Sequence, residues 1–211
     1  MKTFRSKHPS RTYTGPKKSS YGDYRADLAR DFNGRCGYTD CSHAWWGGGF
    51  HIDHFAPKKP KIADPTQLAK FHALENEYSN LVYACPQVNR AKWNDWASND
   101  PAVPVVDDKG YLDPCMDFNQ YFERTDSGGI MPKDDPIAKY MWEKLKLYLF
   151  RYELYWRMEQ LASRLDQLQK FRTLPKLPQN VQLEILTAIA DLASEHRSYF
   201  QYLETNYAEI I

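Results

Sequence analysis

The last third of the chain carries a helical repeat that limits what it can fold into. Over residues 137–168, apolar side chains recur every three or four residues, which is the spacing of one face of an α-helix. Pro175 and Pro178 end this pattern because proline cannot continue a helix, and a second apolar repeat covers residues 181–203. We expect residues 137–168 to form one long helix and the second repeat another. The short loop between them favours antiparallel neighbours.

The sequence before this repeat has shorter and more varied patterns. Apolar spacing, proline positions and aromatic residues predict a mixture of short helices and extended segments, so the expected fold class is α+β. We expect helices over residues 20–32, 67–77 and 86–97. We also expect a β-hairpin or irregular extended chain over 36–55, extended or loop-like chain over 78–84, and loops with one short hairpin over 98–135.

Charge is unevenly distributed along a chain whose net charge is only +1. Residues 1–35 contain nine Lys and Arg against three Asp and Glu, whereas residues 36–132 contain eight against thirteen. Residues 1–19 show no apolar repeat, so we expect a flexible or extended basic arm that either follows a nucleic-acid backbone or only aids solubility. The expected organisation is an arm (1–19), a central domain (20–135) and a helical region (136–211).

Composition argues against several protein classes. The mean hydropathy is −0.71, and no apolar run approaches the ~18 residues that a membrane-spanning helix needs. The first residues lack the apolar stretch of a secretory signal, and four cysteines in 211 residues do not form a disulfide framework. We expect a cytoplasmic protein with no membrane partner.

A short cluster of polar residues carries the strongest chemical signal. His51, Asp53 and His54 lie within four residues, and in a strand the first two would point to the same side. A carboxylate beside an imidazole suits metal-assisted hydrolysis, in which one group holds a cation and the other takes a proton from water. Asn80 and Asn89 follow, and an amide oxygen is a usable ligand for a hard cation.

Asp53-His54, Asn80 and the segment Cys85-Pro86-Gln87-Val88-Asn89-Arg90-Ala91-Lys92 resemble the HNH endonucleases. The resemblance covers residues 36–94 and implies the family's core, the ββα-metal finger. It implies that His54 is the general base and that Asn80 orients it. It also implies that Asp53 and Asn89 hold a divalent cation, with Mg²⁺ or Mn²⁺ as the expected cofactor.

Substrate contacts are expected from basic residues around this core. Lys92 is similar to a family lysine that meets phosphate, and Arg90 on the same helix can hold phosphate oxygens. Lys58 and Lys59 lie in the loop after His54 and are candidates for the same role. His51 is expected to touch either the substrate or the water around the metal.

The zinc knuckle common in this family, C-x-x-C twice, is degraded here. Thr39 and Val88 stand where the second cysteines would be, and neither can replace a thiolate in a tetrahedral site. We therefore expect no structural zinc, although Cys41, His43 or Cys115 are alternative ligands.

The expected function is a metal-dependent HNH endonuclease that cleaves nucleic acid, with DNA favoured over RNA. Residues 112–132 are similar, more loosely, to HNH proteins of bacterial anti-phage systems, including the Septu nuclease subunit and its retron-linked relatives. That resemblance implies a defence role and an ATPase subunit that docks on the C-terminal helices, which otherwise would only cover the nuclease core. The alternatives are an RNase acting on tRNA and a binding module that does not cleave.

Overall fold

A computed structural model describes residues 1–47 and 49–206, and its fold is mixed α+β. The chain forms two compact units, residues 1–148 and 149–211. Helix α4 (Pro136–Lys144) belongs to the first unit, so the boundary falls later than the expected one between residues 135 and 136. The last residues of the expected helical region, 207–211, lie outside the described residues.

A two-stranded antiparallel ribbon and a helix contain most of the predicted site residues. Strand β2 (His51–His54) pairs with β3 (Leu81–Ala84), so that His54 lies opposite Leu81. Helix α3 (Pro86–Lys92) begins after one further residue, with Pro86 in its first turn, where no hydrogen-bond donor is needed. The segment expected to be extended from residue 36 to 55 is a strand only over its last part, because its partner is β3 and not the preceding residues.

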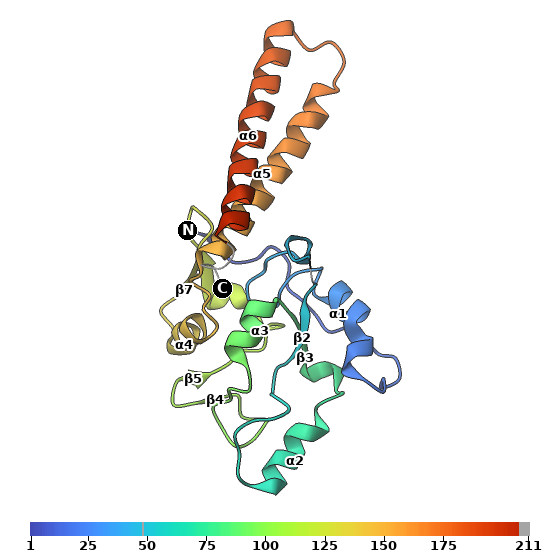
Figure 1. The fold of residues 1–211 in the computed structure, drawn as a ribbon, viewed down its shortest axis with the longest axis vertical. Coiled ribbons are helices and arrows are strands. Elements are labelled where there is room, and N and C mark those ends of the chain that lie inside the picture. The colour runs from blue at the N-terminus through green and yellow to red at the C-terminus, as the bar shows by residue number, and fades with distance from the viewer. Residues whose placement is uncertain (48, 207–211) are drawn as a thin grey trace. The chain divides into compact units, whose positions relative to one another are not determined.

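The ribbon lies between two short helices, as Figure 1 shows. Helix α1 (Arg25–Asp31) packs against β3, and α3 packs against β2. A 3₁₀ turn over Tyr21–Tyr24 leads into α1, and its first turn is closed by a capping box from Ser20. The apolar side chains between these elements are buried: Leu28, Phe32, Leu81, Val82 and Val88.

The N-terminal segment is part of the fold: residues 1–19, expected to be a flexible or extended arm, are held by strand pairing and hydrogen bonds and are not a free arm. Strand β1 (Lys2–Thr3) pairs with β6 (Phe122–Arg124), which pairs in turn with β7 (Ile130–Pro132). The buried guanidinium of Arg5 donates to the main-chain oxygens of Gly37 (2.6 Å) and Pro114 (3.1 Å). These hydrogen bonds join residues far apart in the chain, which a local pattern of charge cannot reveal.

The remaining elements of the first unit are short. Helix α2 spans Pro65–Ala73, and β4 (Val105–Val106) forms a hairpin with β5 (Lys109–Gly110). With β6 and β7, residues 98–135 thus contain two hairpins, where one was expected.

The second unit is a helical hairpin made of α5 (Phe150–Arg172) and α6 (Gln179–Thr205), whose helices run antiparallel in Figure 1. The single long helix expected over 137–168 is instead α4 followed by α5, because the chain turns between them at Lys146, where φ is 53°. Arg157 of α5 donates to the Tyr199 hydroxyl of α6 at 3.2 Å. Among the described residues, no helix has the length and apolar character needed to cross a membrane.

Candidate active site on the β2–α3 segment

A cleft of about 390 Å³ brings together five of the residues predicted from the sequence. Its walls come from β2, the loop that follows it, and α3. The predicted residues that line it are Asp53, His54, Lys58, Lys59 and Asn89, and Tyr21, Trp93 and Asn94 lie beside them. His51, Asn80, Arg90 and Lys92 do not line this cleft, and each has a different position.

His54 is held in one tautomer by the backbone. Its Nε2 lies 2.9 Å from the main-chain oxygen of Glu75, and a carbonyl can only accept, so Nε2 carries the proton and Nδ1 keeps its lone pair. The ring of Tyr21 packs edge-on against the imidazole at 4.8 Å between centroids. Burial lowers the pKa of His54. The Glu75 carbonyl and Asp53 act to raise this pKa, but the effect of burial is larger. The imidazole is therefore suited to accept a proton at neutral pH.

Asn80 supports the loop around His54 without touching the imidazole. Its side-chain oxygen accepts from the Ala56 amide at 2.8 Å, and its side-chain nitrogen donates to the Ala56 carbonyl at 3.0 Å. The same nitrogen donates to the Leu74 carbonyl at 3.3 Å, next to the residue that binds His54. This buried amide thus joins the loop after β2 to the segment whose main-chain oxygen binds His54.

Asp53 is buried between two partners. The Tyr38 hydroxyl donates to one carboxylate oxygen at 2.8 Å, and the Lys92 ammonium lies 3.3 Å from the same oxygen. Burial raises the pKa of Asp53, while Lys92 and Tyr38 act in the opposite direction. A further positive charge in the cleft would favour the ionised carboxylate.

Asn89 and His51 form a pair on neighbouring elements. The Asn89 side-chain nitrogen donates to His51 Nδ1 at 3.0 Å, which leaves the amide oxygen as the atom able to bind a cation. The His51 side chain is exposed, and burial of its inner part together with Arg90 and Arg25 lowers its pKa. Arg90 is exposed on α3, where a substrate can reach it.

Lys92 has a position that excludes the predicted contact with phosphate. Its side chain has no exposed surface, and its ammonium donates to the main-chain oxygen of His54 at 2.7 Å. We therefore correct its assignment from substrate binding to support of β2. Arg90 and Lys59, by contrast, are exposed and remain candidates for substrate binding.

Three of the four cysteines are buried near the start of α3. The Cys85 amide donates to the Cys36 sulfur at 3.3 Å, and the Thr39 hydroxyl donates to the Cys41 sulfur at 3.0 Å. Burial raises the pKa of the Cys85 thiol, and the neighbouring sulfurs add to this effect. Thr39 thus forms a hydrogen bond to a cysteine and does not occupy a cysteine's place as a metal ligand. The absence of structural zinc stays a prediction.

The donors at the cleft fit a hard divalent cation. Among the described residues, no group of three or more His, Cys, Asp or Glu side chains could hold a metal by itself. A cation here would take the carboxylate of Asp53 and the amide oxygen of Asn89, with water filling the other positions, as Mg²⁺ commonly does.

Sequence reasoning does not reveal the roles of Tyr38 and Glu75. The sequence pattern around Tyr38 predicts only packing, and Glu75 acts through its main-chain oxygen, which no residue type can signal.

Comparison with known proteins gives no match to a family model, a curated protein or a solved structure.

Proposed function

We propose that this chain is a metal-dependent endonuclease of the HNH type, with β2, β3 and α3 as its ββα finger. One observation carries the proposal: a histidine with its Nδ1 lone pair available lies in the same cleft as Asp53 and Asn89. A base beside two oxygen donors is the arrangement that metal-assisted hydrolysis of a phosphodiester needs.

In this proposal each residue has a separate task. His54 accepts a proton at Nδ1 from the attacking water, and the Glu75 carbonyl holds the ring while it becomes charged. Asp53 and Asn89 would hold the divalent cation, which when bound would supply positive charge near the phosphate. Lys92 and Tyr38 keep the Asp53 carboxylate in place, and Asn80 keeps the His54 loop in place.

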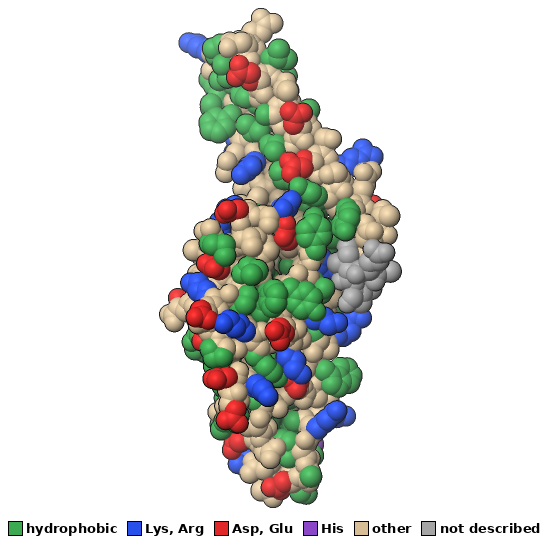
Figure 2. All heavy atoms as spheres, turned by 90° about the vertical axis from the view of Figure 1, so that its left-hand side faces the viewer, with side chains coloured by type: hydrophobic (Ala, Val, Ile, Leu, Met, Phe, Trp, Pro, Cys, Tyr) green, Lys and Arg blue, Asp and Glu red, His purple; other side chains and the backbone are tan. Residues whose placement is uncertain are grey.

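Positive charge for the substrate comes from the loop after β2. Lys59 is exposed, and Lys58 is half-buried with its ammonium 3.0 Å from Glu75 and over the ring of Tyr21. On the face shown in Figure 2, Lys and Arg are interspersed with Asp and Glu. We infer that phosphate binding depends on the few lysines at the cleft. The preference for DNA over RNA is proposed on the family resemblance alone.

The test is nicking of a supercoiled plasmid by the purified full-length chain in Mg²⁺ or Mn²⁺. Cleavage that stops when a chelator is added supports the proposal. Binding without cleavage at any metal concentration would favour the non-cleaving module instead. Cleavage of tRNA but not of DNA would favour the RNase. Because the defence role and the ATPase partner rest on resemblance alone, they need a separate test, which is co-purification with an ATPase.

A further inference from the structure

Trp93 has a backbone conformation that is unusual for a large side chain. Its φ is 50° and its ψ is −129°, and the Asp95 amide donates to the Lys92 carbonyl at 3.0 Å across it. This is the first central position of a type II′ turn, where glycine is strongly preferred. A tryptophan here carries backbone strain, and such strain is often kept at functional sites.

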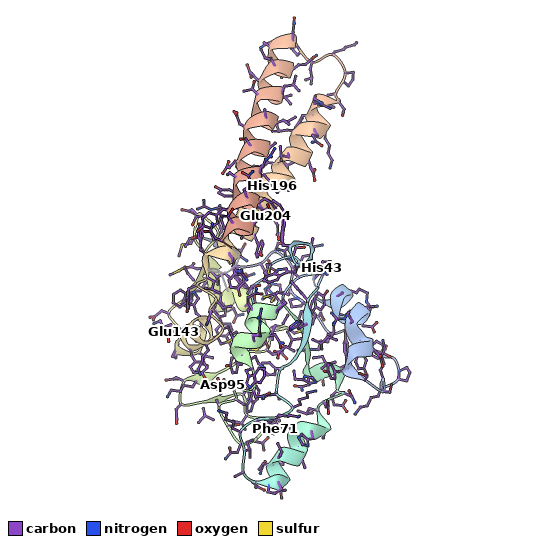
Figure 3. All side chains as sticks on the ribbon, viewed as in Figure 1. His43, Phe71, Asp95, Glu143, His196 and Glu204 are labelled. Carbon is purple, nitrogen blue, oxygen red and sulfur yellow. The ribbon has the colours of Figure 1, made fainter. Side chains whose placement is uncertain are left out.

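The structure fixes this turn from both sides. On one side, the buried ammonium of Lys92 is bound to β2. On the other side, the Asp95 carboxylate (labelled in Figure 3) accepts from the hydroxyls of Tyr111 at 2.7 Å and Tyr140 at 2.9 Å. The ring of Trp96 packs edge-on against Phe55 at 5.3 Å. Lys92 and Asp95, the first and last residues of the turn, are therefore anchored, and the turn cannot relax without breaking these interactions.

The indole of Trp93 is exposed. Trp93 is 70% accessible to solvent, the highest value among the large aromatic side chains described. None of the described residues makes a ring contact or a side-chain hydrogen bond with it. Exposure of an indole is unfavourable, so neither packing nor hydrogen bonding explains why this residue is held in a strained turn.

The position of Trp93 relates it to the candidate active site. It lines the cleft that contains Asp53 and His54, and it also lines a second cleft of about 290 Å³. Lys59 lies at the first cleft and Lys61 at the second, and both are exposed. A nucleic-acid backbone crossing these lysines would bring its bases to the indole between the two clefts.

We propose that Trp93 is a stacking platform for an unpaired base next to the scissile phosphate, so that the substrate is single-stranded or locally unpaired nucleic acid. This inference rests on the proposed nuclease function and adds the substrate class. An indole stacks on a base only when that face of the base is free, and in a duplex the neighbouring bases cover it. A tryptophan side chain has only two rotatable bonds, so an exposed indole on an anchored turn loses little freedom on binding, which is what a stacking surface requires.

The test compares Trp93→Gly and Trp93→Tyr, each combined with His54→Ala in the full-length chain so that the probe stays intact. Glycine adopts the observed turn without strain, so Trp93→Gly removes the ring and preserves the backbone. The probe is one fluorescein-labelled oligonucleotide of mixed sequence, used single-stranded and annealed to its complement, and binding is followed by fluorescence anisotropy in Mg²⁺. Phe171→Ala, which removes a 55% exposed ring on α5, is the matched control.

We expect Trp93→Gly to weaken single-strand binding roughly 5- to 150-fold, the range measured for removal of one base-stacking side chain. Trp93→Tyr should retain most of the affinity, and duplex binding should be unchanged in both variants and in the control. Equal single-strand affinity with and without the ring would overturn the inference, as would an equal weakening for single strand and duplex. If the chain with His54 intact cuts nucleic acid but Trp93→Gly binds single strands normally, this inference fails and the proposed function stands. If the parent neither binds nor cuts, the proposed function fails with it.

Discussion

The buried ammonium of Lys92 donates a 2.7 Å hydrogen bond to the main-chain oxygen of His54. The same ammonium lies 3.3 Å from the carboxylate of Asp53, so one side chain of α3 holds two consecutive residues of β2. Because Lys92 has no exposed surface, its charge acts inside the protein and does not face a substrate. This link joins the helix that carries Asn89 to the strand that carries His54.

Replacement of Lys92 by methionine should destabilise the fold. The Asp53 carboxylate would remain buried without its cation, and removal of one partner of a buried ion pair typically costs about 3–5 kcal/mol. Urea unfolding of the purified variant would measure this destabilisation. The double variant Asp53→Asn with Lys92→Met should lose less stability than the sum of the two single changes, because the unpaired charge is gone.

Lys59→Ala is the matched comparison for Lys92, because Lys59 is exposed at the cleft. It should leave the free energy of unfolding nearly unchanged. If Lys59 binds one phosphate of a duplex, the replacement should make the log-log salt slope of duplex binding shallower by about 0.9. A Lys92→Met variant that is as stable as Lys59→Ala but binds nucleic acid more weakly would restore Lys92 to the substrate-binding residues.

Replacement of His54 by alanine should abolish cleavage while folding and binding stay near normal. Removal of one general base typically lowers the rate by ~10²–10⁴-fold. Plasmid nicking under conditions where the parent is active measures the effect, with His72→Ala, an exposed histidine of α2, as the control. Nicking by His54→Ala at the rate of the control would show that His54 is not the base.

Replacement of Asn89 by alanine should raise the Mg²⁺ concentration needed for half-maximal cleavage. The amide oxygen is one of only two protein donors proposed for the cation, so excess metal should restore part of the rate. Cleavage measured over a range of Mg²⁺ concentrations, with Asn89→Asp retaining an oxygen donor, tests this role. An unchanged metal requirement together with a collapse of nucleic-acid affinity would make Asn89 a substrate-binding residue.

Asp31→Asn should loosen the N-terminal segment in a pH-dependent way. Burial raises the pKa of Asp31, but hydrogen bonds from the amide and hydroxyl of Thr12, from Tyr78 and from Arg30 outweigh this, so the pKa lies below its ordinary value. A carboxylate with a lowered pKa in the folded state adds stability above the unfolded-state value of about 3.9, and this contribution disappears as the pH falls through the folded-state pKa.

The expected result is therefore a clear decrease in unfolding free energy at pH 7 that shrinks below about pH 4. Urea unfolding of the parent, Asp31→Asn and the exposed control Asp166→Asn across this range measures it. A difference that is the same at both ends of the range would show that the Asp31 charge contributes nothing to stability.

Several features of this chain follow from the sequence alone. The apolar repeat and the prolines at 175 and 178 predict the two helices of the C-terminal hairpin. Helix α6 begins and ends near the expected residues, and α5 ends near the expected residue but begins at Phe150 instead of residue 137. Pro86 predicts the start of α3. Helical periodicity and proline act over a few neighbouring residues, so their effect can be read without knowledge of distant segments. Asp53 and His54 are likewise close because they are consecutive in the sequence.

Other features exist only through tertiary structure. The pairing of β2 with β3, the direction of the Lys92 side chain and the burial of Arg5 each depend on segments distant in sequence. The local sequence cannot distinguish a lysine that binds phosphate from one that is buried against a carboxylate, because it does not show which side of a helix faces the core. The tautomer of His54 depends on a main-chain oxygen of Glu75, a group that every residue carries, and so only the fold could select it.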